Sequence, residues 1–164
     1  MINHQQISFD SVYTYLHGKG GTMTQWQRLL SDGNEFFDNE KWVQAEYCYK
    51  EAASYLDNLW SVDTLNIELL MAWIGTCHNL AVLHETKGNP QVSLEYLLIP
   101  HHRMLALSQN GQQCDDMQLI ALKALQLTFM PVLLFSRKYS ICKKCQKGLK
   151  EFKAQLDENQ GTVH

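Results

Sequence analysis

The segment from Trp26 to Asp57 constrains the fold most, because its small and aromatic residues are spaced as two packed helices require. Its apolar residues fall on two helical faces, and the polar segment Asp38–Glu40 separates them. A helix hairpin cannot bury its apolar face alone, so it must pack against further helices. Weaker copies of the pattern follow twice along the chain, which predicts three stacked hairpins.

Helical periodicity dominates from Met23 onward, and sustained alternation of the strand type is almost absent. The sequence therefore predicts an all-α fold with about six main helices in stacked antiparallel hairpins. Capping residues, glycines and prolines set the expected boundaries. The first expected helix starts after Thr22 or Thr24 and breaks near Asp38, and the second covers Lys41–Leu56. The third is capped by Ser61 or Asp63 and ends at Lys87–Pro90, and the fourth is kinked or ended by Pro100. The fifth runs from Asp115 or Asp116 to Ser136 and is interrupted by Pro131, and the sixth covers Tyr139–Leu156.

A chain of 164 residues fits one domain with one core. We expect an N-terminal arm over 1–22 with a possible short helix, a helical domain over 23–158 and a flexible tail over 159–164. The arm carries apolar residues that need cover, either on the same chain or on a second subunit, and the second choice predicts a homodimer made by arm exchange. These residues are Phe9, Val12, Tyr13 and Leu16.

A formal net charge of -3 argues against general affinity for nucleic acid or for an anionic membrane surface. The lysines between Lys138 and Lys153 are interpreted as a solvated helix face. The apolar stretches Leu65–Leu83 and Leu119–Phe135 contain polar side chains that are costly in lipid, so we expect buried central helices and no membrane span. The sequence has no secretory signal, and its five cysteines are an odd number, which together predict a cytoplasmic protein with free thiols.

The first hairpin resembles a tetratricopeptide repeat, a two-helix unit with small residues where the helices cross. Its small-residue sites correspond to Gly33, Ala45 and Ala52, and its bulky ones to Leu29, Phe36 and Tyr49. The second hairpin matches in part, at Leu80, Ala81, Ser93 and Leu97, with Pro100 where alanine is usual. In the third, Cys142 stands where Ala45 does, while Met130 and Leu149 replace small residues. The units repeat at about 48 residues rather than the usual period of about 34, so longer helices and linkers must absorb the difference.

The resemblance implies a concave groove that receives a peptide or a partner helix. We therefore expect a non-catalytic protein-binding adaptor, similar in size and acidity to small bacterial chaperones of secreted translocator proteins, with no cofactor and no catalytic residues. An equally open interpretation is that the groove residues are covered by neighbouring helices or by the arm. The expected groove residues are Leu30, Asn34, Phe37, Asn79, Leu127, Leu134 and Phe135.

Two alternatives remain open, and the first is a zinc-dependent regulator or enzyme that uses a cluster of cysteines and histidines. Cys142 and Cys145 have a metal-like spacing, but a structural zinc site needs four ligands, which His101, His102 and Cys114 could complete only through folding. A redox role receives less weight than zinc, because a thioredoxin-like motif follows a strand. The other alternative is a purely structural homo-oligomer with no groove ligand.

Overall fold

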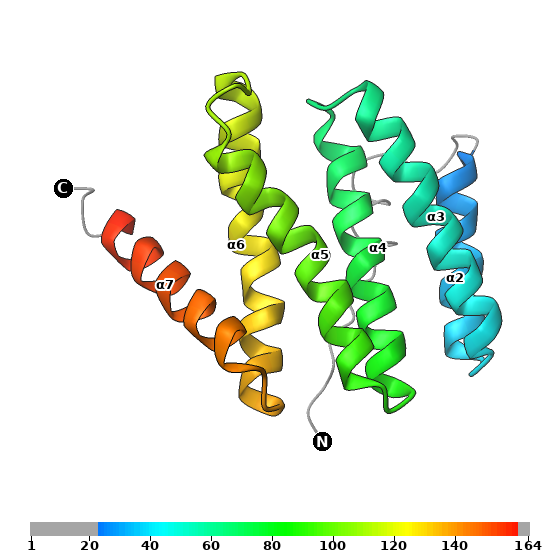
Figure 1. Ribbon diagram of the computed structural model, residues 1–164. Coiled ribbons are helices and arrows are strands. Elements are labelled where there is room, and N and C mark those ends of the chain that lie inside the picture. The colour runs from blue at the N-terminus through cyan, green and yellow to red at the C-terminus, as the bar shows by residue number, and fades with distance from the viewer. Residues whose placement is uncertain (1–22, 161–164) are drawn as a thin grey trace. The chain divides into compact units, whose positions relative to one another are not determined.

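The computed structural model describes residues 23–160, with side chains described through 154. Over this range the chain forms helices and no strand, which confirms the all-α prediction (Figure 1). The expected arm over 1–22 and the last four residues of the expected tail lie outside the described residues. The helices are α2 (Gln25–Asp38), α3 (Trp42–Val62), α4 (Ile67–Thr86), α5 (Pro90–Gln109), α6 (Asp115–Lys138) and α7 (Lys143–Gln160).

The chain divides into two compact units, and the boundary between Leu83 and His84 falls inside α4. The first unit contains α2, α3 and most of α4. The second contains the last residues of α4, then α5, α6 and α7. Helices that follow one another in the chain pack as hairpins, α2 on α3 in the first unit and α5 on α6 in the second.

The first hairpin is held by the small residues that the sequence singled out. Gly33 of α2 and Ala45 and Ala52 of α3 are all buried. Tyr49 of α3 is fully buried against Gly33, and its hydroxyl donates a hydrogen bond to Asn34 Oδ1 at 2.7 Å. A side chain at position 33 would occupy the space that the tyrosine ring fills. The small residues are therefore required by the close approach of the two helices.

The turns after α2 and α4 have the same backbone hydrogen bonds. The N–H of Lys41 donates to the carbonyl of Phe36, and the N–H of Asn89 donates to that of His84, each at 2.8 Å. This six-residue closure is a Schellman turn, and it requires a left-handed residue just before the donor. Glu40, with φ 57°, and Gly88, with φ 77°, fill that place. The two turns are offset by the predicted spacing of about 48 residues.

The burial of small residues repeats at the same spacing of about 48 residues. Gly33 and Ala45 in the first hairpin are buried, as are their equivalents Ala81 and Ser93. The longer period is accommodated by helices of 20 to 24 residues from α3 to α6. Cys142 departs from the pattern, because it is exposed and precedes α7, whereas Ala45 and Ser93 are fourth residues of their helices.

Several helix boundaries differ from the prediction. The second helix continues to Val62 rather than ending at Leu56, since no glycine or proline interrupts it. The next helix is capped by Asn66, whose Oδ1 accepts the N–H of Leu69 at 3.2 Å. Ser61 instead ends up near the end of α3, and Asp63 supports the cap by accepting a hydrogen bond from Asn66 Nδ2 at 3.0 Å.

The expected helix end at Pro100 and the expected interruption at Pro131 were wrong, whereas a kink at Pro100 stays a prediction. Both prolines lie inside continuous helices, α5 and α6. A proline in a helix removes one backbone hydrogen bond and costs about 3 kcal/mol, so the surrounding helix must be stabilised by packing. Pro100 is fully buried, which places it in the core rather than at a helix end.

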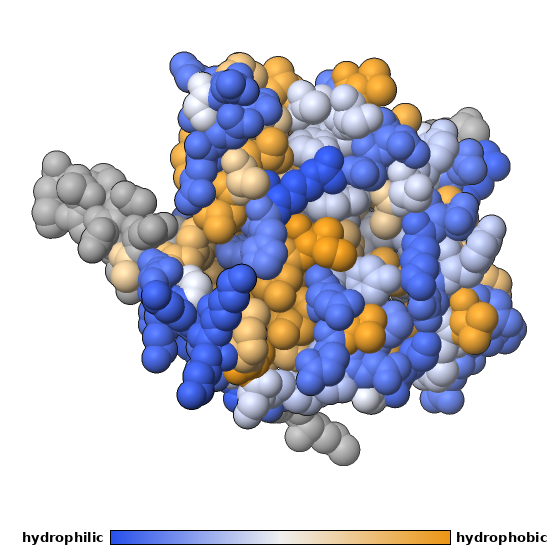
Figure 2. Space-filling view, viewed as in Figure 1, coloured by the Kyte–Doolittle hydropathy of each residue, from blue (hydrophilic) through white to orange (hydrophobic). Residues whose placement is uncertain are grey.

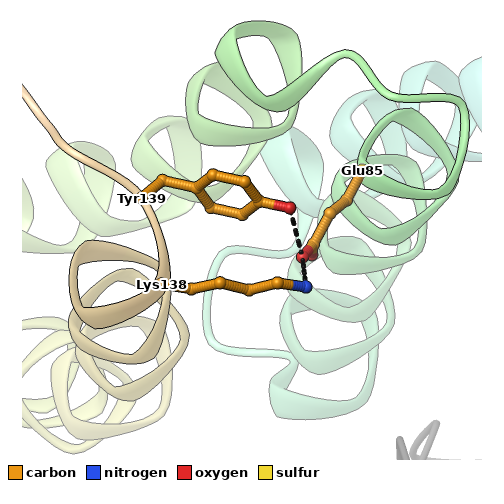
Figure 3. A network of polar contacts seen from close by, with 3 residues as sticks. All are labelled: Glu85, Lys138 and Tyr139. Atoms are coloured by element: carbon orange, nitrogen blue, oxygen red, sulfur yellow. Dashed lines mark hydrogen bonds and ion pairs between the residues drawn. The ribbon is translucent and has the colours of Figure 1, made fainter.

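The C-terminal end of α6 is tied to the last turn of α4 within the second unit. Glu85 Oε1 accepts hydrogen bonds from Lys138 Nζ at 2.6 Å and from the Tyr139 hydroxyl at 3.2 Å (Figure 3). The hydrogen bond with Glu85 raises the pKa of Lys138. Because the lysine is exposed, the ion pair contributes little to stability and mainly holds the end of α6 next to the last turn of α4.

Candidate functional site

Helix α6 carries large apolar side chains on two opposite faces. One face is buried and forms the core of the second unit, at Met117, Ala121, Ala124, Leu125, Thr128, Phe129, Val132 and Phe135. The other face presents five large aliphatic side chains that are 50 to 55% exposed, namely Leu119, Leu122, Leu127, Met130 and Leu134. With about 3.6 residues per turn, these five positions fall along one side of the helix. We call this set the α6 surface stripe.

An apolar stripe of this kind is unusual on an exposed helix, because a surface helix ordinarily has one apolar face and one polar face. Hydrophobic side chains reach the surface over part of α6 beside α7 in the second unit (Figure 2). Large exposed apolar patches mark interaction sites in soluble proteins. Lys123 and Gln126 lie among these residues on the same side of the helix and are exposed, so two polar side chains interrupt the stripe.

Helix α6 also has the length and hydropathy of a membrane span, and 39% of its most apolar window is buried within the structure. Core helices of soluble proteins meet the same criteria of length and composition. Its buried face is built for packing in the second unit, where Thr128 Oγ1 lies 3.2 Å from His101 Nδ1.

The predicted groove residues of the first unit have different surroundings. Leu30 is buried, and Asn34 accepts the hydrogen bond from Tyr49. Phe37 is half-buried and packs edge-on against Trp42, with ring centroids 5.2 Å apart. Asn79 of α4 is half-buried. None of these four residues offers a large exposed apolar surface.

The three predicted groove residues of the second unit all lie on α6, but they do not share a face. Leu127 and Leu134 belong to the α6 surface stripe, whereas Phe135 points to the buried side, 7% exposed. Sequence reasoning missed Leu119, Leu122 and Met130 as members of the exposed set. Lys123 and Gln126 mark the exposed side in the sequence, but large apolar residues outnumber them there, so α6 has apolar residues on both sides.

The adjacent histidines of α5, His101 and His102, differ in their surroundings. His102 is exposed, while His101 is buried between the rings of Phe129 and Phe152, with centroids 6.1 and 5.1 Å away. Burial, with a smaller contribution from the neighbouring His102, lowers the pKa of His101 to about 4. His101 is therefore a neutral part of the core at neutral pH, hydrogen-bonded to Thr128.

The cysteines divide into buried and accessible groups. Cys48 and Cys77 are buried, whereas Cys114 and Cys142 are exposed and Cys145 is half-buried. Cys142 and Cys145 lie at the start of α7 with their Sγ atoms 3.0 Å apart. Within the described part of the chain, no group of three or more His, Cys, Asp or Glu side chains is placed to hold a metal ion. The zinc ligands that were considered from spacing are thus not assembled there.

The fold and this surface define a class, an all-α protein of packed helix hairpins with an exposed apolar helix face. The chain belongs to the family described as protein of unknown function (DUF2753), whose model matches residues 24–163. No curated protein and no solved structure matches the chain.

Proposed function

We propose that this protein is a non-catalytic binding module that accepts an apolar peptide or partner helix on the α6 surface stripe. The single observation that carries the proposal is the row of five large aliphatic side chains, each at least half exposed, on one side of α6. Burying such a row against a partner removes apolar surface from water, at about 25 cal/mol per Å². The spacing suits a helix or an extended segment laid along α6.

The finer proposal is that the helix hairpins are related to tetratricopeptide repeats and that the protein acts as an adaptor or chaperone-like module. The two Schellman turns, and the burial of Gly33, Ala45, Ala81 and Ser93 at the same offset, support a repeated unit. Binding surfaces of stacked helical repeats commonly receive peptides. A cytoplasmic location and a protein partner, rather than nucleic acid or membrane, complete the proposal.

The first test places a photo-reactive amino acid at Leu134 or, as a control, at Val43, which is 77% exposed on α3. Irradiation in living cells should give a covalent adduct with another protein from position 134 and not from position 43. Adducts that contain only a second copy of this chain, or only its own residues 1–22, would overturn the adaptor function and support a structural homo-oligomer or self-covered surface.

A matched pair of charge variants tests the energetics of the same surface. Leu127→Glu combined with Leu134→Glu should abolish capture of the cross-linked partner, because two carboxylates would enter an apolar interface. Val43→Glu combined with Val62→Glu introduces the same charges at exposed positions of α3 and should leave capture unchanged. Equal capture by both double variants would contradict the proposal. Circular dichroism verifies that each variant is folded.

A further inference from the structure

The first turn of α7 brings two sulfur atoms together in a way that the binding function does not use. Cys142 immediately precedes the helix, and Cys145 is its third residue. Their Sγ atoms are 3.0 Å apart. A disulfide has an S–S distance of about 2.05 Å, so bond formation requires a movement of about 1 Å, which side-chain rotation within one turn can supply.

The surroundings of Cys142 favour its thiolate. Its Sγ accepts the N–H of Cys145 at 3.3 Å, as a capping side chain would. The Cys145 thiol and amide are the main groups that lower the pKa of Cys142, and the backbone and charge of Lys144 contribute. The positive end of the helix dipole adds to the stabilisation of a negative sulfur at this place.

The two sulfurs are also differently accessible. Cys142 is exposed, whereas Cys145 is half-buried. The hydrogen bond with Cys142 and the partial burial of the Cys145 side chain raise the pKa of Cys145. This asymmetry suits an outer cysteine that attacks a disulfide and an inner cysteine that resolves the mixed disulfide.

A second exposed cysteine on the same chain shows what is special about this turn. Cys114 likewise immediately precedes a helix, but the first turn of α6 carries Asp115 and Asp116, where α7 begins with Lys143 and Lys144. No sulfur partner for Cys114 is found among the described residues. Cys114 is therefore an internal control for accessibility without a paired sulfur.

We propose that Cys142 and Cys145 form a dithiol site that undergoes thiol–disulfide exchange with small disulfides of the oxidised glutathione class. The Cys142 thiolate attacks one sulfur of the small disulfide, whose S–S bond breaks and releases one thiolate that takes a proton from solvent. Cys145 then loses its proton and attacks Cys142 Sγ in the mixed disulfide, which releases the second small thiol. The protein dithiol is oxidised by two electrons, and one small disulfide is reduced to two thiols.

This arrangement needs no strand before the motif. The sequence alone favours redox chemistry less than zinc binding, because a thioredoxin-like motif follows a strand. The structure supplies the chemically relevant parts by another route, namely a helix start, paired sulfurs and neighbouring lysines. The site lies on α7 and the binding surface on α6, so the exchange chemistry does not depend on the proposed binding function.

The test incubates the whole reduced protein with oxidised glutathione, then alkylates and maps the remaining thiols under denaturing conditions by mass spectrometry. Reduced protein carries five alkylatable cysteines. After the reaction, two of the five thiols should no longer be alkylated. Both should lie in one peptide whose mass is lower by two hydrogens and which carries no glutathione. A glutathione adduct retained on Cys142, or five thiols still free, would overturn the proposal.

Two variants make the mechanism distinguishable from general thiol reactivity. Cys145→Ser should stop at the mixed disulfide and retain one glutathione on Cys142. Cys114→Ser should still form the Cys142–Cys145 bond, as the wild type does. Retention of glutathione on Cys114 to the same extent as on Cys142 in the Cys145→Ser variant would contradict a site built by the first turn of α7. If a variant fails to fold, the peptide map of the wild-type protein by itself still tests the proposal.

Discussion

Replacing Gly33 by alanine tests whether the packing of the first hairpin depends on the absence of a side chain at that position. A Cβ at Gly33 would lie 2.7 Å from Tyr49 Cε1, 2.8 Å from Tyr49 Cδ1 and 3.3 Å from Cys48 Cβ. Ordinary carbon contacts are about 3.5 to 4.0 Å, so the ring must move by about 1 Å. Tyr49 is fully buried and its hydroxyl is held by Asn34, so the ring has little freedom to move.

Two opposing terms give the expected magnitude. Alanine is favoured over glycine inside a helix by about 1 kcal/mol. Overpacking a buried site costs about 1–3 kcal/mol, and loss of the tyrosine hydrogen bond adds about 1 kcal/mol. We therefore expect Gly33→Ala to lower the free energy of unfolding by about 1–3 kcal/mol.

The assay is urea unfolding of the first unit, followed by tryptophan fluorescence. All four tryptophans, at positions 26, 42, 60 and 73, belong to that unit, so the signal reports on it selectively. The matched control is Gly148→Ala in α7, where no atom lies within 4 Å of the added carbon. This substitution should raise stability by about 0.5–1 kcal/mol, measured by circular dichroism.

A second background isolates the clash. In a Tyr49→Leu variant the ring is gone, so adding Gly33→Ala should recover the helix-forming advantage and become neutral or stabilising. The reasoning would be refuted if Gly33→Ala in the wild-type background were as stabilising as Gly148→Ala, or if its cost were the same with leucine at position 49.

Three further predictions concern turns, caps and pH. Glu40→Gly should raise the free energy of unfolding by about 0.5–1 kcal/mol, and Gly88→Ala should lower it by about 1 kcal/mol, because both positions require a left-handed backbone. A shift of the urea midpoints of the two variants in the same direction would contradict this reasoning. Asn66→Ala should cost about 1 kcal/mol through loss of the cap on the Leu69 amide, and an unchanged midpoint would argue against the cap. Burial lowers the pKa of both His78 and His101 to about 4, so the unfolded chain binds these protons first and stability falls as the pH drops from about 6.5 toward 4. The loss between pH 7.5 and 5 should be roughly 1–2 kcal/mol for each histidine, and urea unfolding that shows equal stability at the two pH values would show that neither is buried neutral.

The sequence predicted the local structure well wherever a single residue carries the physical cause. Gly88 and Pro90 marked a turn because only a flexible residue suits the left-handed position and proline suits a helix start, and both lie where expected. Ala45 and Ala52 were expected at helix crossings and are fully buried. Glu40 shows the limit of this reasoning, since a non-glycine residue fills the same left-handed position.

Predictions failed where distant segments compensate for a local cost. One expected outcome at Pro100 was the end of its helix, but α5 continues through it, because the penalty of one lost hydrogen bond is smaller than the gain from packing a long helix. The cap of α4 was assigned to Ser61 or Asp63 because the second helix was expected to end at Leu56, whereas α3 extends to Val62.

The sequence by itself determined that this protein is helical, where its turns lie, and which small residues its helix crossings require, because backbone sterics and hydrophobic periodicity act over a few residues. Only the tertiary structure decided which apolar side of α6 is buried, because both sides carry similar side chains and the choice depends on what packs against the helix. It also decided that Cys142 lies just before α7, where its Sγ is 3.0 Å from that of Cys145 and accepts the Cys145 N–H, because the helix begins at Lys143 rather than at Tyr139.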